Sequence, residues 1–174
     1  MDAPATARPA WVIAPEPVGS GEVAGLLREY LTDVADRWYR LYRGRAVTAA
    51  EIEGHLAEDP SDDLAPPTGV LLVARHHEAA VGCVGLRWRD EKVVELKRMY
   101  VRPAHRGAGG AAALLAAAEQ LGREWGAERI VLDTRKDLVE ALALYARHGY
   151  AAVPRYNTAE DAPYSEVWLG KALR

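Results

Sequence analysis

The sequence predicts an α/β fold of the α+β kind, in which helices flank a mixed and mostly antiparallel sheet. Three strand-like runs follow one another at 70–75, 80–88 and 93–101, and their connections are short enough only for antiparallel hairpins. Segments with apolar residues at helical spacing lie before these runs and alternate with strands after them. In chain order, the expected elements are βααβββαβαββ.

The first part of the chain is predicted to form one short strand and two helices. Trp11–Ala14 can form the strand, and the next segment has apolar residues at helical spacing, in a pattern that could break near Asp36. Thr48 and Glu51 are three residues apart and form a capping box, which predicts the start of the second helix. Pro60 then ends that helix.

The part of the chain after the three runs is predicted to alternate helices and strands. We expect a helix from about Gly109 to Trp125, a strand at Arg129–Thr134, a helix that Asp137 caps and Gly149 ends, and late strands at Tyr150–Pro154 and Tyr164–Leu169. A polar loop, 155–163, separates the two late strands.

Length and composition indicate one ordinary globular domain. The chain has 174 residues, of which 49% are hydrophobic and 27% are charged, so it can bury a substantial core. We expect residues 10–174 to form this domain and residues 1–9 to form a disordered tail. The tail lacks the apolar stretch of a signal peptide, so none is expected. No apolar run approaches the ~20 residues that span a bilayer, so no membrane partner is expected.

Charge and cysteine content indicate a cytoplasmic protein without a nucleic-acid partner. The net charge of −3 gives no general footprint for nucleic acid. Cys83 is the single cysteine, which excludes an internal disulfide and fits a reducing compartment. It lies among apolar residues of a strand and is expected to be a small buried side chain rather than a nucleophile. His76 and His77 lie in a hairpin turn, and no zinc-type spacing is present, so no metal is expected.

The most informative segment runs from Glu95 to Leu115. A strand ends before Pro103, a glycine-rich turn follows, and a helix rich in alanine and leucine begins. The turn glycines lack a Cβ, so their backbone can lie close to a ligand and direct several N–H groups at one point. The start of a helix adds unpaired donors and the positive end of its dipole. These residues predict a site for an anion such as a pyrophosphate, and five basic side chains are expected to surround it: Lys97, Arg98, Arg102, His105 and Arg106.

Two segments resemble a known family. Residues 106–111, Arg-Gly-Ala-Gly-Gly-Ala, fit the pattern Arg/Gln-x-x-Gly-x-Gly/Ala and resemble the acyl-CoA signature of the GNAT superfamily of N-acetyltransferases. Residues 141–150 resemble the GNAT helix Ala-x-x-Leu-Tyr-x-x-x-Gly-Phe/Tyr. A P-loop would need a Gly-Lys-Ser/Thr ending, and a Rossmann turn would need a third glycine. The expected order of elements also matches the GNAT fold. Many members carry an Asn at the place of Leu138, so that contact is not carried over.

The resemblance implies a cosubstrate and a set of site residues. Acetyl-CoA would bind with its pyrophosphate on the main-chain amides of Arg106, Gly107, Ala108, Gly109, Gly110 and Ala111. The strand residues Met99, Tyr100 and Val101 would bond the pantetheine arm through their backbone, and a backbone N–H, that of Val101, would polarise the thioester carbonyl. Tyr145 has the place of the general acid, which protonates the leaving thiolate.

The general base stays open. Glu95, in the strand that leads to the glycine turn, is the first candidate, and Asp133 is the second. Each could instead be a structural partner, Glu95 of Lys97 or Arg98 and Asp133 of Arg135. Ordered water could also carry the proton away.

The function expected from this resemblance is transfer of an acetyl group from acetyl-CoA to a primary amine of a small molecule or peptide, by direct attack in a ternary complex. One alternative is a GNAT-fold sensor or scaffold that binds acyl-CoA without turnover, and another is an acetyltransferase for protein N-termini or lysines. The acceptor would be recognised by the N-terminal helices and the loop at 155–163. A homodimer could form through the late strand at Tyr164–Leu169.

Overall fold

The computed structural model describes residues 11–174, so the tail predicted at residues 1–9 lies outside the described residues. The elements follow the predicted order, with one short 3-10 turn added at Pro103–His105. They are β1 (Val12–Pro15), α1 (Gly21–Arg43), α2 (Ala49–Glu58), β2 (Gly69–His76), β3 (Ala79–Trp88), β4 (Val93–Val101), α3 (Gly110–Glu124), β5 (Arg129–Thr134), α4 (Val139–Arg147), β6 (Ala151–Ala152) and β7 (Val167–Ala172).

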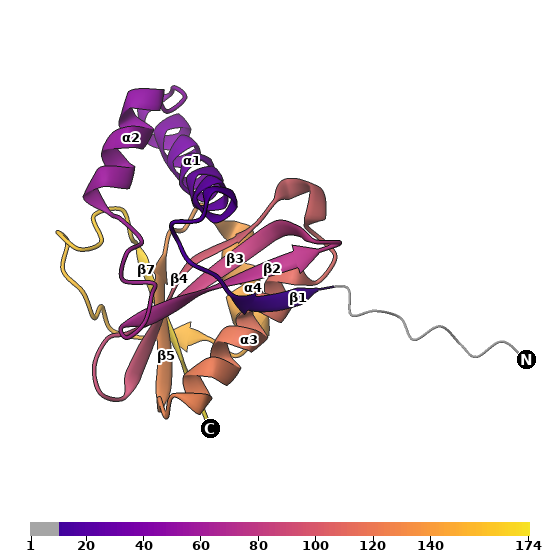
Figure 1. The fold of residues 1–174 in the computed structure, drawn as a ribbon. Helices are drawn as coiled ribbons and strands as arrows, with labels where there is room; N and C mark the ends of the chain where they lie inside the picture. Colours follow the sequence, from indigo (N-terminus) through magenta and orange to yellow (C-terminus); the bar gives the residue numbers. More distant parts are fainter. Residues whose placement is uncertain (1–10) are drawn as a thin grey trace, which may run out of the picture.

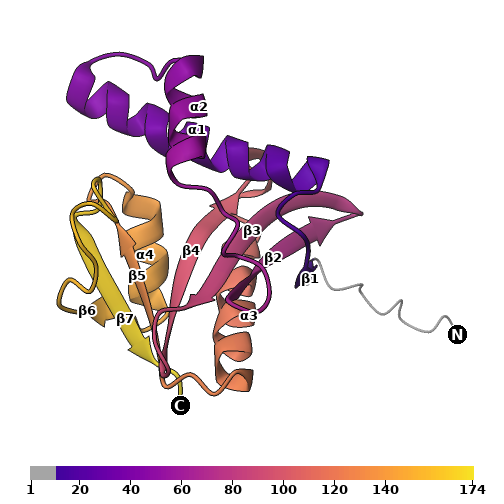
Figure 2. The same cartoon turned by 60° about the vertical axis from the view of Figure 1, so that its left-hand side comes forward.

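The strands form one seven-stranded sheet in the order β1-β2-β3-β4-β5-β7-β6 (Figure 1). All neighbours are antiparallel except β4 and β5, which are parallel. The predicted mixed sheet and the β2-β3-β4 meander are therefore confirmed. α1 covers one face with α2 packed on it, and α3 and α4 cover the other face (Figure 2).

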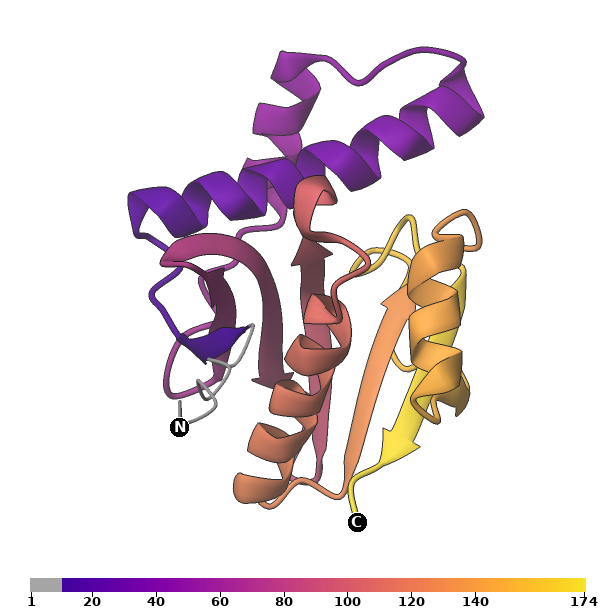
Figure 3. The same ribbon diagram turned by 90° about the vertical axis from the view of Figure 1, so that its right-hand side faces the viewer.

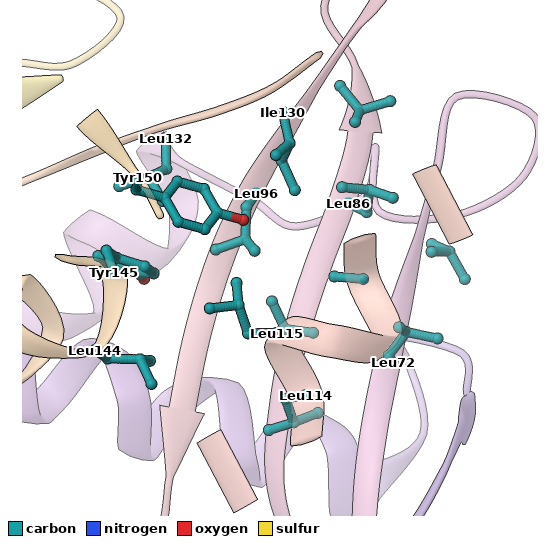
Figure 4. Close-up of a cluster of buried hydrophobic side chains, with 14 of the residues drawn as sticks. Leu72, Leu86, Leu96, Leu114, Leu115, Ile130, Leu132, Leu144, Tyr145 and Tyr150 are labelled. Atoms are coloured by element: carbon teal, nitrogen blue, oxygen red, sulfur yellow. The ribbon is translucent and has the colours of Figure 1, made fainter. Parts of the chain in front are cut away.

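Two hydrophobic clusters follow from strand alternation, since successive side chains point to opposite faces of a sheet. On the face of α3 and α4, strand residues such as Leu86 and Leu96 pack against Leu114 and Leu115 (Figure 4). On the opposite face, a smaller cluster packs strand residues, among them Cys83, under α1.

α1 differs from its prediction because it continues unbroken past Asp36 to Arg43. The carboxylate of Asp36 is fully used at the helix surface: Oδ2 accepts from Arg40 Nε at 2.6 Å and Oδ1 accepts from the Val47 N–H at 3.0 Å. The polar residue therefore stabilises the helix and the turn after it instead of interrupting them. Gly44 ends the helix with a left-handed φ of 67°.

The capping box of α2 is confirmed, whereas the predicted cap of α4 is wrong. Thr48 and Glu51 bond each other's backbone N–H groups reciprocally. The N-cap of α4 is Leu138, with no side-chain hydrogen bond. Asp137 instead binds the Arg135 guanidinium, with two contacts of 2.9 Å, because an ion pair two residues away competes for its carboxylate.

The two late strands lie at different residues from those predicted. β6 has only two residues, and β7 begins at Val167 instead of Tyr164. Tyr164 lies outside the sheet because its ring packs against Trp38 of α1, at a centroid distance of 5.0 Å. The pairing with β5 runs from Val167 to Ala172.

Candidate active site

β4 and β5 lie side by side only at their beginnings. Parallel pairing joins Val93, Val94 and Glu95 to the first three residues of β5 and ends at the pair Glu95 and Val131. β4 continues to Val101, and β5 continues to Thr134, but the two strands diverge (Figure 3). We call the space between the diverging ends the wedge. On this side, β4 has no partner strand beyond Glu95, so its edge is open. The opposite edge of β4 stays paired with β3.

A β-bulge interrupts the pairing of β4 with β3 in the middle of the wedge. Cys83 pairs with Tyr100 and Gly85 pairs with Lys97, so β4 carries one extra residue over this stretch. Arg98 lies in the bulge with a left-handed φ of 57°. Its carbonyl oxygen accepts from the Cys83 thiol at 3.3 Å, which holds the bulge against β3.

Beyond the bulge, alternate peptide groups of β4 face the wedge. The N–H of Arg102 donates to the Val81 carbonyl of β3 at 2.8 Å. Tyr100, two residues earlier, therefore also directs its peptide groups toward β3, and those of Met99 and Val101 face the other way. The Val101 carbonyl is bonded by Arg106 Nε at 2.8 Å, which leaves its N–H directed into the wedge.

A run of free N–H groups lies where β4 leads into α3. The N–H groups of residues 107–112 donate to no acceptor among residues 11–174, and the first helical bond of α3 is from Ala113 to Gly109. Gly107 and Gly109 have φ values of 81° and 84°, which side chains with a Cβ rarely adopt. Consecutive N–H groups at a helix start form a concave site for an anion.

The Trp11 side chain packs against this turn. Its Nε1 donates to the Ala108 carbonyl at 3.1 Å. A Cβ on Gly110 would lie 2.8 Å from the Trp11 ring, so only glycine allows this close packing. The sequence predicted Trp11 only as the start of a strand and not as a support of this turn, because no local pattern joins it to a turn 97 residues away.

The expected basic patch around the turn does not form as one surface. Three of its members are bound to acidic side chains: Arg98 to Asp59 at 3.1 Å, Arg102 to Glu29 at 2.7 Å and Arg106 to Asp33 at 3.6 Å. Lys97 lies four residues upstream of Val101, at the narrow end of the wedge, and has no acidic partner within salt-bridge distance among residues 11–174. The free backbone N–H groups of residues 107–112 are therefore the main candidates for binding an anion at this turn.

Tyr145 lies on α4 and is only 4% exposed. Its ring packs on Tyr150 at a centroid distance of 5.5 Å (Figure 4). Burial raises the pKa of Tyr145, and the nearby Tyr30 hydroxyl and Asp133 carboxylate raise it further. The hydroxyl is thus protonated at neutral pH, and it has no hydrogen-bond partner in the part of the chain that the structure describes.

Glu95 is buried, at 1% exposure, and both of its carboxylate oxygens are occupied. Oε1 accepts from Arg87 of β3, with 2.8 Å to Nε and 2.7 Å to Nη2, and Oε2 accepts from the Tyr156 hydroxyl at 2.9 Å. Arg87 also pairs with Asp63. The structural partner of Glu95 is therefore Arg87 across the sheet, and not Lys97 or Arg98.

Asp133 lies on β5 and is bound only by neutral donors. The Asn157 amide and the Ser165 hydroxyl each donate to it at 2.7 Å. Arg135, the expected partner, binds Asp137 instead. No cation lies within salt-bridge distance of Asp133 among the described residues.

The loop between β6 and β7 is fixed on both strands of the wedge. Tyr156 binds Glu95 of β4, and Asn157 and Ser165 bind Asp133 of β5. These loop residues were not predicted individually, because they meet their partners only after β7 has paired with β5. The polar composition of 155–163 was the only signal in the sequence.

Hydrogen bonds hold α1 against α4 and against the loop between β6 and β7. Arg37 binds the Glu140 carboxylate of α4 at 2.7 and 3.0 Å, and Tyr42 donates to Glu166 at 3.3 Å. A hollow of about 290 Å³ lies farther away, beside the paired beginnings of β4 and β5, with Arg89 and Tyr156 in its wall. It does not reach the open end of the wedge, where the free N–H groups lie.

Cys83 is confirmed as a buried side chain, and burial raises its pKa to about 12, so its thiol is not a reactive nucleophile at neutral pH. Within residues 11–174, no group of three or more His, Cys, Asp or Glu side chains could hold a metal ion. In the same range, no helix is both long and apolar enough to cross a membrane.

Comparison with known sequences gives the same family for most of the chain. The model of the acetyltransferase (GNAT) family matches residues 27–150. An uncharacterized N-acetyltransferase of Schizosaccharomyces pombe is 32% identical over 150 residues, which cover 84% of this chain and 86% of that protein.

Solved structures share the fold. A candidate acyl-CoA N-acyltransferase of Klebsiella pneumoniae is 25% identical, with a TM-score of 0.70 over 94% of this chain and 98% of that one. A GNAT family acetyltransferase of Elizabethkingia anophelis, solved with acetyl-CoA bound, is 18% identical, with a TM-score of 0.63 over 95% of this chain and 99% of that one.

Proposed function

The chain belongs to the acetyltransferase (GNAT) family, and from that premise we propose that it moves an acetyl group from acetyl-CoA to a primary amine of a small molecule or peptide. The observation that supports this most strongly is the wedge, whose open β4 edge leads to the free N–H groups of residues 107–112. An extended chain with amide groups and a pyrophosphate at its end matches this combination of features. Acetyl-CoA has both.

In the proposed complex, the main-chain amides from Gly107 to Ala111 hold the pyrophosphate, whereas the Arg106 N–H, also expected there, donates to the Pro103 carbonyl at 3.3 Å. The backbone of Met99, Tyr100 and Val101 bonds the pantetheine arm as an added strand would. Acetyl-CoA supplies the activated acetyl group, and the Val101 N–H polarises its carbonyl. The enzyme's main contribution is to hold the thioester and the amine in contact.

Tyr145 is the proposed general acid. The thiolate that leaves as the amide forms needs a proton, and a tyrosine hydroxyl near the sulfur can supply it. Burial keeps the Tyr145 hydroxyl protonated at neutral pH, so its proton is available when the thiolate forms.

Between the two carboxylates, we favour Asp133 as the group that receives the proton of the amine. Both carboxylate oxygens of Glu95 are already occupied, by Arg87 and by the Tyr156 hydroxyl, so neither is open to an incoming amine. Asp133 has only neutral donors around it and therefore attracts a cationic amine. In this account, Glu95 positions Tyr156 and the loop between β6 and β7.

The proposal is tested by release of free thiol from acetyl-CoA with a panel of amines, amino acids and peptides. We expect release that depends on the amine, and we expect Tyr145→Phe to lower kcat by about 100-fold or more while CoA affinity stays the same. CoA binding without release across the panel would instead favour a sensor. Absence of CoA binding would contradict the proposal.

A further inference from the structure

Lys97 and Asp133 occupy equivalent places on the two sides of the wedge. The last pair of β4 and β5 is Glu95 with Val131, and each of the two charged residues lies two positions further along its strand. Side chains two residues apart share a face of the sheet. Both therefore lie on the face of α1 and the loop between β6 and β7, opposite the face of Leu96 and α3.

Neither side chain has an oppositely charged partner among the described residues. The Lys97 side chain has no salt bridge or hydrogen bond among the described residues, and its nearest carboxylate along the strand, Glu95, is occupied by Arg87 and Tyr156. Asp133 receives only the neutral donors Asn157 and Ser165. By contrast, the neighbouring Arg87, Glu95 and Arg98 each have an oppositely charged partner.

The environment of Lys97 makes an anionic ligand favourable. Burial lowers the pKa of its ammonium group, and the adjacent guanidinium groups of Arg87 and Arg98 lower it further. A carboxylate bound there would remove this penalty by supplying the missing counter-charge.

The environment of Asp133 favours a cationic ligand. Its two contacts are neutral donors, and no cation lies within salt-bridge distance of it among the described residues. An ammonium group would supply the missing counter-charge.

We propose that the acceptor is a small amine that also carries a carboxylate, with its ammonium group at Asp133 and its carboxylate at Lys97. This inference rests on the proposed function and adds the substrate class. The ammonium gives one proton to Asp133, and the free amine forms the new C–N bond as the C–S bond of the thioester breaks. The thiolate takes its proton from Tyr145 and leaves as the thiol. The nitrogen loses its second proton as the neutral amide forms, and that proton restores the Tyr145 hydroxyl.

The test compares each acceptor with its own carboxamide, which keeps the amine and removes the negative charge. The panel holds α-amino acids with small, aromatic and charged side chains, together with β-alanine and γ-aminobutyrate. The separation of the two charges in the best acceptor then reports the spacing that the site accepts. For each pair, the ratio of kcat/KM for the acid to that for the amide is measured.

We expect the wild-type ratio to favour the acids. Lys97→Met keeps the apolar stem, and it should lower the ratio by about 10- to 100-fold, the effect of losing a charge-assisted hydrogen bond. Lys97→Arg should keep part of the preference, because a cation remains. Asp133→Asn should lower kcat/KM for acids and amides alike and leave the ratio in place. Melting temperature and CoA affinity show that each variant is folded.

Two results would overturn the inference separately from the proposed function. One is a wild-type enzyme that acetylates amides or neutral amines as well as acids, and the other is an acid-to-amide ratio that Lys97→Met does not change. In both cases amine-dependent thiol release would still support the proposed function. If no amine releases thiol although CoA binds, the proposed function fails and the inference fails with it.

Discussion

Tyr150 and Tyr156 differ in one respect that single substitutions can measure. The Tyr150 ring extends between Leu96 and Ile130 in the core (Figure 4), and its hydroxyl has no partner among the described residues. The Tyr156 hydroxyl donates to Glu95 at 2.9 Å. A buried hydroxyl without a partner costs free energy, whereas one that binds a carboxylate stabilises the fold.

We therefore expect opposite effects from removal of the two hydroxyls. Tyr150→Phe should leave the free energy of unfolding unchanged or raise it by up to about 1 kcal/mol, and Tyr156→Phe should lower it by about 1–3 kcal/mol. Urea unfolding followed by circular dichroism measures both. A clear loss of stability in Tyr150→Phe would show that an ordered water or another group satisfies this hydroxyl.

Among the elements, the turn before α3 combines a tight backbone with an aromatic support. Gly110 touches the Trp11 ring, and an added Cβ would lie 2.8 Å from it. Gly110→Ala should therefore displace the turn and weaken CoA binding by about tenfold or more, because several charge-assisted hydrogen bonds depend on its geometry. Gly25→Ala in α1 is the matched control, since nothing lies within 4 Å of its added Cβ. Calorimetric titration gives the CoA affinities of both variants. Equal affinities would show that this turn is not part of the CoA site.

α1 and α2 offer a second matched pair at the same scale. The Thr48 side chain accepts from the Glu51 N–H at 3.2 Å, whereas Ser20, the N-cap of α1, makes no side-chain bond. Thr48→Ala should lower the free energy of unfolding by about 1 kcal/mol, and Ser20→Ala should have a smaller effect. If chemical denaturation gives the two variants equal stability, the capping box contributes nothing to the folded state.

The elements that the sequence predicted correctly are those determined by local signals. The capping box at Thr48, the short hairpin turns and the glycines before α3 each act within a few residues. The errors arise where distant contacts compete with local ones. Asp137 has the residue type of a cap but binds Arg135, and Tyr164 has strand propensity but packs against Trp38.

The candidate site shows the same division. Its backbone part, 99–101 and 106–111, could be predicted because the residues are consecutive and form one strand, turn and helix. Its side-chain part could not be predicted fully. Glu95 and Asp133 were identified as candidates, but their partners Arg87, Tyr156 and Asn157 come from three other segments that meet only in the folded sheet.

At the scale of the whole molecule, the proposed function places both substrates where β4 and β5 diverge. α3 and α4 line one side of the wedge, and α1 and the loop between β6 and β7 lie over the other (Figure 3). In the proposed function, the acyl carrier enters from one side and the acceptor from the other. The thioester and the amine then meet between the two strands.

Residue-resolved amide hydrogen exchange with and without CoA tests most directly whether acetyl-CoA binds in this wedge through backbone N–H groups. The N–H groups of residues 107–112 have no acceptor among residues 11–174, so they should exchange fast in the free protein. We expect CoA to slow exchange at these residues and at Met99 and Val101. Slowed exchange confined to other parts of the sheet, or none at saturating CoA, would contradict the account.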